Sequence, residues 1–253
     1  MILLQQRYRS ADAARQAELD RAWARNEASG LFTEIVAVDG ALKRWTFADL
    51  LALAAERFPG EVCVIANSDI SFDESLAKLE PRLEPDMLVA LTRWDDGTAP
   101  SMEGRVDPRT WRFYSQSQDS WVFRAGALPK FQADFALGVP RCENRFAYEA
   151  ATAGVAVLDP ALSIRTWHHH ATNVRSWKRG DHYEGPLYFP HLTTLEARVA
   201  EGFVLERAGW QKREWIAALD GGTPARLTLR PLGPPSRSVW PKIGLRWPIY
   251  RRS

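Results

Sequence analysis

Residues 62–73 read VCVIANSDISFD and decide how the chain is expected to fold. The first five are apolar and mostly β-branched, which predicts a strand buried on both faces. The polar triplet Asn67-Ser68-Asp69 follows at once, at the carboxyl end of that strand. Because open α/β sheets bind ligands at this edge, the stretch predicts an α/β protein with Asn67, Ser68 and Asp69 in its binding site.

The chain around this stretch alternates between strand and helix patterns. Further strands are expected at residues 1–6, 34–38 and 87–91, and helices at 10–25 and 47–58. Alternation at this spacing predicts a mostly parallel central sheet flanked by helices.

The second half of the chain is expected to be less regular. A polar loop is predicted at 95–109, short strands at 111–114, 120–123 and 155–158, a helix at 144–153 and a strand at 163–170. Residues 226–253 hold seven Arg or Lys and no Asp or Glu, interleaved with Pro and aromatic residues. We therefore expect one catalytic domain at 1–225 and an extended basic arm at 226–253.

Composition and charge narrow the class of protein. The 253 residues fit one large domain with an appendage, and a net charge of +2 gives no reason to expect a nucleic-acid partner. No apolar run reaches the ~18 residues that cross a bilayer, and the apolar run at the N-terminus is too short for a signal peptide. These features predict a cytoplasmic protein whose two cysteines, Cys63 and Cys142, are reduced.

Asp69 is the residue of the triplet with the clearest chemistry. A carboxylate beside the polar Asn67 can hold Mg²⁺ or Mn²⁺ together with the phosphates of a substrate. The alternative is an Asx turn followed by a helix cap at Asp73, with no metal. The spacing alone does not choose between them.

The order of elements resembles the GT-A-fold, nucleotide-sugar-dependent glycosyltransferases, in particular those of family 2. The resemblance covers about the first 180 residues and rests on the βα-βα-β beginning, on Asp39 after the second strand and on residues 67–69 after the third. It implies that Asp39 contacts the nucleotide. Residues 67–69 match the DxD motif, whose metal bridges the donor diphosphate, although Asn67 stands where the family has Asp. The implied reaction moves a sugar from a nucleotide-diphosphate sugar to a glycan or another hydroxyl acceptor, in polysaccharide or glycan assembly.

Arg93 and Trp94 follow the predicted strand at 87–91 and should lie at the same sheet edge. The Arg93 guanidinium can clamp a phosphate, and Trp94 offers a flat surface for a base or a sugar. The alternative for Arg93 is a surface ion pair with Asp95 or Asp96.

Two acidic residues are candidates for the catalytic base. Glu143 opens a predicted helix, where the resemblance implies an acidic residue that deprotonates the acceptor hydroxyl. Asp119, beside Trp121, suits acceptor binding and is the second candidate. Helix capping by Glu143 and a plain loop position for Asp119 are the alternatives. A helix N-terminus also stabilises a carboxylate, so a base at Glu143 needs compensating desolvation.

Residues 167–170 read WHHH and offer further metal ligands. If they form a strand, alternation places His168 and His170 on one face, where they can join Asp69 around a divalent cation. The resemblance implies a late His as metal ligand in some families. Arg175 follows closely and can contact phosphate. The alternative for the imidazoles is ordinary hydrogen bonding.

Other functions remain open at this stage. A sugar nucleotidyltransferase would share a similar sheet, and a catalytically inactive protein that binds carbohydrate or a nucleotide sugar would keep the same fold. The basic arm can pack on the domain, on a second subunit, or on the inner face of an anionic membrane that carries a lipid-linked acceptor. A single carboxylate base favours an inverting reaction.

Overall fold

The computed structural model describes residues 1–40, 43–95, 114–172, 174, 181–197, 199–205 and 217–218. The arm predicted at 226–253, most of the loop predicted at 95–109, and Arg175 lie outside these residues. The elements in chain order are β1 (Ile2–Arg7), α1 (Ala13–Ala28), β2 (Glu34–Asp39), α2 (Phe47–Arg57), β3 (Val62–Ala66), β4 (Ile70–Phe72), the 3₁₀ helix η1 (Glu74–Arg82), β5 (Met87–Thr92), β6 (Gln118–Arg124), α3 (Cys142–Thr152), β7 (Ala156–Leu158), β8 (Thr166–His168), β9 (Leu187–Pro190), β10 (Val199–Ala200), β11 (Gly202–Leu205) and β12 (Ala217–Ala218).

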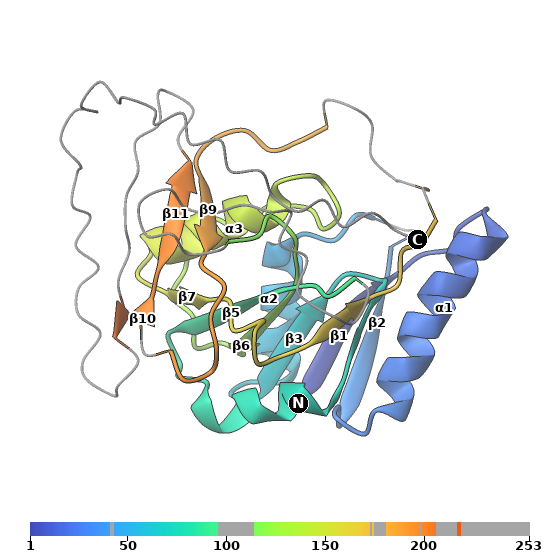
Figure 1. The fold of residues 1–253 in the computed structure, drawn as a ribbon, viewed down its shortest axis with the longest axis horizontal. Helices are drawn as coiled ribbons and strands as arrows, with labels where there is room; N and C mark the ends of the chain where they lie inside the picture. Colours follow the sequence, from blue (N-terminus) through green and yellow to red (C-terminus); the bar gives the residue numbers. More distant parts are fainter. Residues whose placement is uncertain are drawn as a thin grey trace, which may run out of the picture.

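A six-stranded sheet with the order β2-β1-β3-β6-β5-β7 forms the centre of the molecule (Figure 1). Its strands are parallel except for β6, which runs antiparallel to both β3 and β5. The carboxyl ends of β1, β2, β3, β5 and β7 therefore share one edge of the sheet, and β6 begins at that edge. The predicted mostly parallel α/β sheet is confirmed.

Helices cover both faces of the sheet, as the alternating pattern predicts. On one face Phe47 of α2 stacks on Phe146 of α3 with ring centroids 4.0 Å apart, and both pack edge-on against the fully buried Trp121 of β6. On the other face Leu76 and Leu79 of η1 join a second buried cluster. Within the described residues, no helix combines the length and the apolar character that crossing a membrane requires.

Most predicted elements are confirmed with small shifts at their ends. Helix α1 begins after Asp12, whose side chain accepts a hydrogen bond from the Arg15 backbone N–H, and so it starts later than the predicted cap at Ser10. Helix α2 begins with a capping box, in which the Thr46 side chain accepts from the Asp49 N–H and the Asp49 side chain accepts from the Thr46 N–H.

The short strand β4 was not predicted, and it matters most for the site. It pairs antiparallel with β8, so that Ile70 lies opposite His168. The strand predicted at 163–170 is in fact limited to Thr166–His168, because only three of its residues find partners on β4. This pairing brings the histidines to the residue that precedes β4, Asp69.

Candidate metal centre and active site

The turn between β3 and β4 is held by two buried amide side chains. Gln5 of β1 donates from Nε2 to the carbonyl oxygens of Asn67 (2.8 Å) and Ile70 (3.0 Å). Asn26 of α1 donates to Gln5 Oε1 and Ile70 O, and accepts from the Phe72 N–H. Buried polar groups are stable only when they are hydrogen-bonded, and these groups find their partners only in this arrangement. The bonds therefore fix the backbone on both sides of Asp69.

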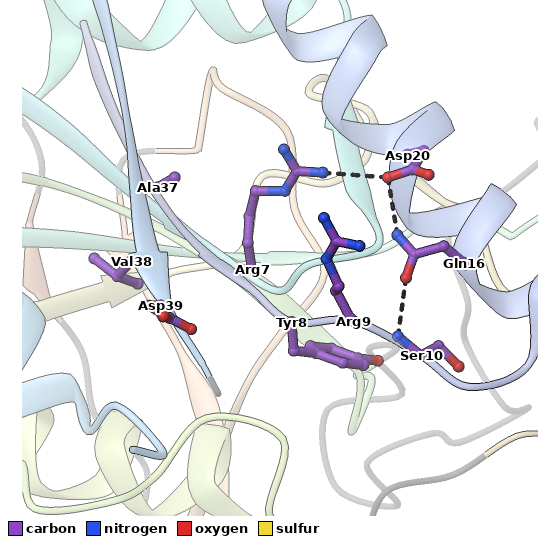
Figure 2. Close-up of a pocket in the computed structure, with 9 residues that line it drawn as sticks. All are labelled: Arg7, Tyr8, Arg9, Ser10, Gln16, Asp20, Ala37, Val38 and Asp39. Atoms are coloured by element: carbon purple, nitrogen blue, oxygen red, sulfur yellow. Dashed lines mark hydrogen bonds and ion pairs between the residues drawn. The ribbon is translucent and has the colours of Figure 1, made fainter. Parts of the chain in front are cut away.

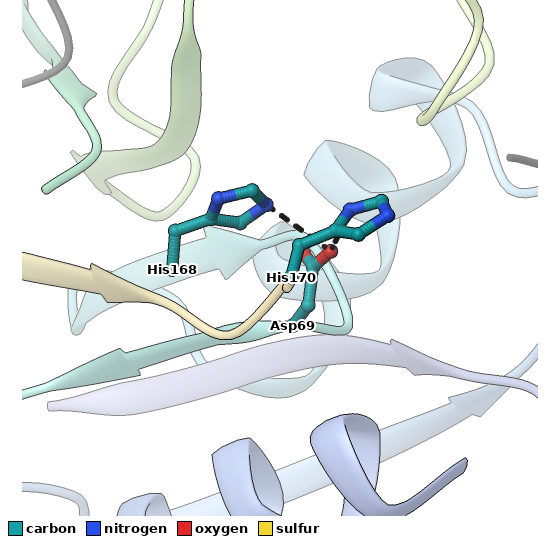
Figure 3. A group of neighbouring side chains, drawn as sticks. All are labelled: Asp69, His168 and His170. Carbon is teal, nitrogen blue, oxygen red and sulfur yellow. Dashed lines mark ion pairs between the residues drawn. The ribbon is translucent and has the colours of Figure 1, made fainter. Parts of the chain in front are cut away.

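Asp69, His168 and His170 come together at the edge of the sheet, and we call them the Asp69 triad (Figure 3). Asp69 Oδ2 lies 3.4 Å from His168 Nε2 and 3.4 Å from His170 Nδ1. Two ligand atoms about 2.1 Å from one ion lie roughly 3.0–3.4 Å apart at ordinary coordination angles, so these spacings suit a shared cation. All three ligand atoms lie within 4.8 Å of one another. The three residues predicted as metal ligands are thus brought together.

Each imidazole of the triad is oriented through its other nitrogen. His168 Nδ1 lies 2.8 Å from Asp95 Oδ1, and His170 Nε2 lies 3.1 Å from the Val174 carbonyl oxygen. Both partners are acceptors, so each of these nitrogens carries the proton and the opposite nitrogen faces Asp69. Histidines that bind metals usually have such an outer partner. The middle residue, His169, turns away and pairs with Ser71 Oγ at 2.8 Å.

The charges of the triad depend on one another. Burial alone would raise the pKa of the Asp69 carboxyl, but hydrogen bonds from His168 and His170 and the charge of Arg15 hold the pKa well below its ordinary value. Burial alone would lower the pKa of His168, but hydrogen bonds to Asp69 and Asp95 raise it to about 9. A cation bound here would therefore replace a proton, as is usual for imidazole sites.

Two residues of α1, Arg15 and Glu18, complete the surroundings of the triad and were not predicted. Arg15 Nη2 donates to Asp69 Oδ2 at 2.5 Å, and Arg15 Nη1 donates to Glu18 Oε2 at 3.0 Å. Their signal in the sequence is modest: an i, i+3 pair in the early turns of a helix that follows a strand's carboxyl end. That helix was predicted, but its contact with a segment 150 residues later was not.

Asn67 and Ser68 do not face the triad. Asn67 Nδ2 donates to Asp119 Oδ1 at 2.5 Å, and Ser68 Oγ donates to the Gln6 carbonyl oxygen at 2.6 Å. Of the three residues that match a DxD motif, Asp69 alone points at the imidazoles. Through its hydrogen bond, Asn67 instead connects the turn that carries Asp69 to Asp119.

Arg93 lies between two acids. Its Nη1 donates to Asp119 Oδ2 at 2.9 Å and its Nε donates to Asp95 Oδ1 at 3.1 Å. The predicted pairing with Asp95 is therefore present, together with a second acid. Because Asp95 also contacts His168, charged groups form an unbroken row from Asp119 to the triad.

Trp94, predicted as a flat surface for a base or a sugar, and Trp121, the neighbour of Asp119, are both buried. Trp94 is only 7% exposed and donates from Nε1 to the Ala161 carbonyl oxygen. Trp121 is fully buried beneath α2 and α3. The prediction for Trp94 was wrong, because its ring packs edge-on against Trp167 and belongs to the core.

Glu143, in the first turn of α3, has the environment that a base at a helix N-terminus requires. Burial raises the pKa of its carboxyl to about 8, and the negative charge of Asp119 acts in the same direction. Hydrogen bonds from its own backbone N–H and from Cys142 Sγ (3.3 Å), and the charge of Arg93, oppose this only in part. Desolvation thus outweighs the helix terminus at Glu143. Asp119 is less suited to the role, since both its oxygens accept hydrogen bonds from Asn67 and Arg93.

A cavity of about 620 Å³ opens at the carboxyl ends of β1 and β2 (Figure 2). It is lined by Arg7, Tyr8, Arg9, Ser10, Gln16, Asp20, Ala37, Val38 and Asp39. Asp39, the predicted nucleotide contact, thus borders a hollow large enough for a small molecule. The cavity touches the surroundings of the triad through Tyr8, whose hydroxyl accepts from Arg15 Nη2 at 3.5 Å.

No protein-family model matches this chain, and no curated protein matches it. The function is therefore argued from the geometry of the triad, the cavity and Glu143.

Proposed function

We propose that this protein is a metal-assisted glycosyltransferase that moves a sugar from a nucleotide-diphosphate sugar to a hydroxyl acceptor. The observation that carries the proposal is the orientation of His168 and His170 toward Asp69 by outer hydrogen bonds. A carboxylate with two imidazoles suits a transition ion such as Mn²⁺ better than Mg²⁺, which prefers oxygen ligands.

In this proposal the donor spans the cavity and the triad. The nucleoside lies near Asp39, and the diphosphate extends past Tyr8 toward Asp69. Arg9, at the rim of the cavity, is exposed, and Arg7 is paired with Asp20 at 3.2 Å. Guanidinium groups at such positions favour phosphate over a neutral ligand.

The residues on the other side of the triad serve the acceptor. Glu143, once ionised, takes the proton of the acceptor hydroxyl while its oxygen attacks the anomeric carbon. The bond from that carbon to the diphosphate oxygen breaks, and the leaving diphosphate keeps the electron pair. A cation at the triad would supply positive charge to that leaving group. A single base on the acceptor side favours inversion.

Calorimetry with UDP and GDP, each with and without Mn²⁺, tests the proposal directly. We expect Mn²⁺-dependent nucleotide binding that His168→Gln and His170→Gln weaken, and slow hydrolysis of the matching nucleotide sugar. A nucleotide affinity that is unchanged by Mn²⁺ and by both substitutions would contradict the metal assignment. Nucleotide sugars that never bind would contradict the substrate class.

A second candidate is favoured by the ion pair of Arg15 with Asp69 Oδ2. The guanidinium occupies the oxygen that a metal needs, so a protein that binds a nucleotide sugar without catalysis could dispense with the cation. Nucleotide-sugar binding that is independent of Mn²⁺ and is not followed by hydrolysis would favour this candidate.

A further inference from the structure

Glu18 holds the chain just after His170. Its Oε1 accepts hydrogen bonds from the backbone N–H groups of Ala171 and Thr172, each at 2.8 Å, and its Oε2 accepts from Thr172 Oγ1 at 2.8 Å. Two successive N–H groups that converge on one carboxylate oxygen make a specific anchor for a segment without regular structure.

Arg15 holds the chain just before His170. Its Nη1 donates to the His169 carbonyl oxygen at 3.0 Å and to Glu18 Oε2 at 3.0 Å. One turn of α1 therefore grips the backbone on both sides of His170. The same guanidinium also donates to Asp69. Helix α1 therefore contacts both the carboxylate of the triad and the backbone that carries one of its imidazoles.

Glu18 is a buried acid whose hydrogen bonds offset the cost of its burial. The Glu18 side chain is only 9% exposed, and burying a carboxylate is costly unless it is fully hydrogen-bonded. Glu18 meets that condition, and the hydrogen bonds from Arg15 and residues 171–172 overcome its burial and hold its pKa at about 2. Its partners are the groups that place a metal ligand.

We propose that Glu18 is a positioning residue of the metal centre, which sets where His170 Nδ1 lies relative to Asp69. The inference rests on the proposed metal site, but it requires no transfer activity. Glu18 lies outside the triad and acts through the backbone of residues 171–172.

The test is a double-mutant cycle on the full-length protein with Co²⁺, whose visible absorption reports coordination by imidazole, and with Mn²⁺ calorimetry. Glu18→Ala is expected to weaken both affinities about 10–100-fold and to change the Co²⁺ spectrum, as loss of outer-shell partners does. His170→Gln should then cost little further affinity in the Glu18→Ala background, because the imidazole is already displaced.

Glu18→Gln distinguishes a positioning role from an electrostatic one, because Gln keeps the shape of the side chain and loses its charge. It is also a smaller change than Glu18→Ala and is less disruptive to folding. The amide oxygen can still accept from Ala171 and Thr172, while the amide nitrogen can no longer accept from Arg15. Positioning through residues 171–172 therefore predicts an affinity nearer to that of the wild type than to that of Glu18→Ala. A purely electrostatic role predicts that Gln is as weak as Ala. Glu27→Gln, an exposed acid on the same helix, is the matched control and should change nothing.

The outcomes are distinct. Additive losses from Glu18→Ala and His170→Gln, or a Glu18→Gln variant as weak as Glu18→Ala, would overturn the positioning role while the metal site stands. A wild-type protein that binds neither Co²⁺ nor Mn²⁺ would overturn the metal centre itself, and the role of Glu18 with it.

Discussion

Asp69 and Glu143 are two carboxyl groups of one sheet edge whose surroundings push their pKa values in opposite directions. Asp69 faces two imidazoles and a guanidinium, which keep the carboxylate ionised although it is buried. Glu143 is partly buried beside a thiol and another acid, and its pKa rises to about 8. The difference shows that burial alone does not set the charge of an acid, and that its partners decide whether the charged form survives.

The contrast supports the two roles proposed for these residues. A permanently charged carboxylate is suited to hold a cation, and an acid with a pKa near neutral pH is suited to move a proton. The row of charges through Asp95, Arg93 and Asp119 joins the two sides. Substitutions of Asp69, of Glu143 or of the groups that set their charge therefore test the two roles.

Asp69→Asn should have the largest effect. The amide keeps the shape but loses the charge, and Mn²⁺ affinity should fall at least about 100-fold, since even outer-shell changes cost 10–100-fold. Transfer should be lost as well. Unfolding should become easier by about 3–5 kcal/mol, because the buried Arg15 loses a charged partner. Calorimetry and denaturant titration measure these changes.

Glu34→Gln is the matched control for Asp69→Asn, because Glu34 is an exposed acid paired with Arg57 at 2.7 Å. It should leave metal affinity and transfer unchanged. Unaltered Mn²⁺ affinity in Asp69→Asn would remove Asp69 from the metal centre.

Glu143→Gln should lower the rate of transfer about 10²–10⁴-fold, the usual contribution of a general base, and leave Mn²⁺ affinity unchanged. Asp119→Asn should have a smaller effect on transfer, because its oxygens are already engaged by Asn67 and Arg93. Initial rates with a saturating donor measure both. An active Glu143→Gln beside an inactive Asp119→Asn would exchange the two assignments.

The residues of the triad could be predicted from the sequence, but the contact that brings them together could not. Asp69 was predictable because a buried β-branched run ends directly before the triplet that contains it. His168 and His170 were predictable from alternation in an expected strand, although β8 ends at His168 and His170 follows it. The antiparallel pairing of β4 with β8, which joins them, was not predictable, since three-residue strands carry almost no pattern.

Arg15, Glu18 and the burial of Trp94 were out of reach for the same physical reason. Each depends on contacts between segments far apart in the chain, as in the bonds from Glu18 to residues 171–172. Local propensity predicted the helix that carries Arg15 and Glu18, but not which of its residues would face the site. The raised pKa of Glu143 likewise depends on burial, which follows from packing.

Arg15→Met should raise Mn²⁺ affinity about tenfold, or roughly 1.4 kcal/mol. The guanidinium donates to the same Oδ2 that faces the imidazoles, so removing it frees the oxygen and removes a repulsive charge. The bond from Arg15 to the His169 carbonyl oxygen is lost as well, but Glu18 still accepts from the N–H groups of Ala171 and Thr172 and keeps His170 in place. Calorimetry measures the change. Lys78→Met, which removes an exposed cation of η1, should have little effect because solvent screens it. A weaker site in Arg15→Met would mean that Arg15 mainly holds Asp69 in place.

The pH dependence of stability at Glu143 can be tested without any metal or substrate. The pKa of this group rises from 4.5 to about 8 on folding, so between these values the folded state binds more protons than the unfolded state. The free energy of unfolding contributed by Glu143 therefore falls as the pH rises through this interval, and the loss is complete above about pH 8.

In Glu143→Gln the side chain stays neutral at every pH, so the variant does not lose this free energy. The melting temperature of Glu143→Gln, relative to the wild type, should thus increase by on the order of 10 °C between about pH 5 and pH 8.5, at about 1.4 kcal/mol per pH unit and about 2–4 °C per kcal/mol. Glu27→Gln, in which the exposed acid of α1 is replaced, should show a flat difference. If the difference for Glu143→Gln were equally flat, Glu143 would titrate like an exposed acid, and it would lose the property that distinguishes it from Asp69.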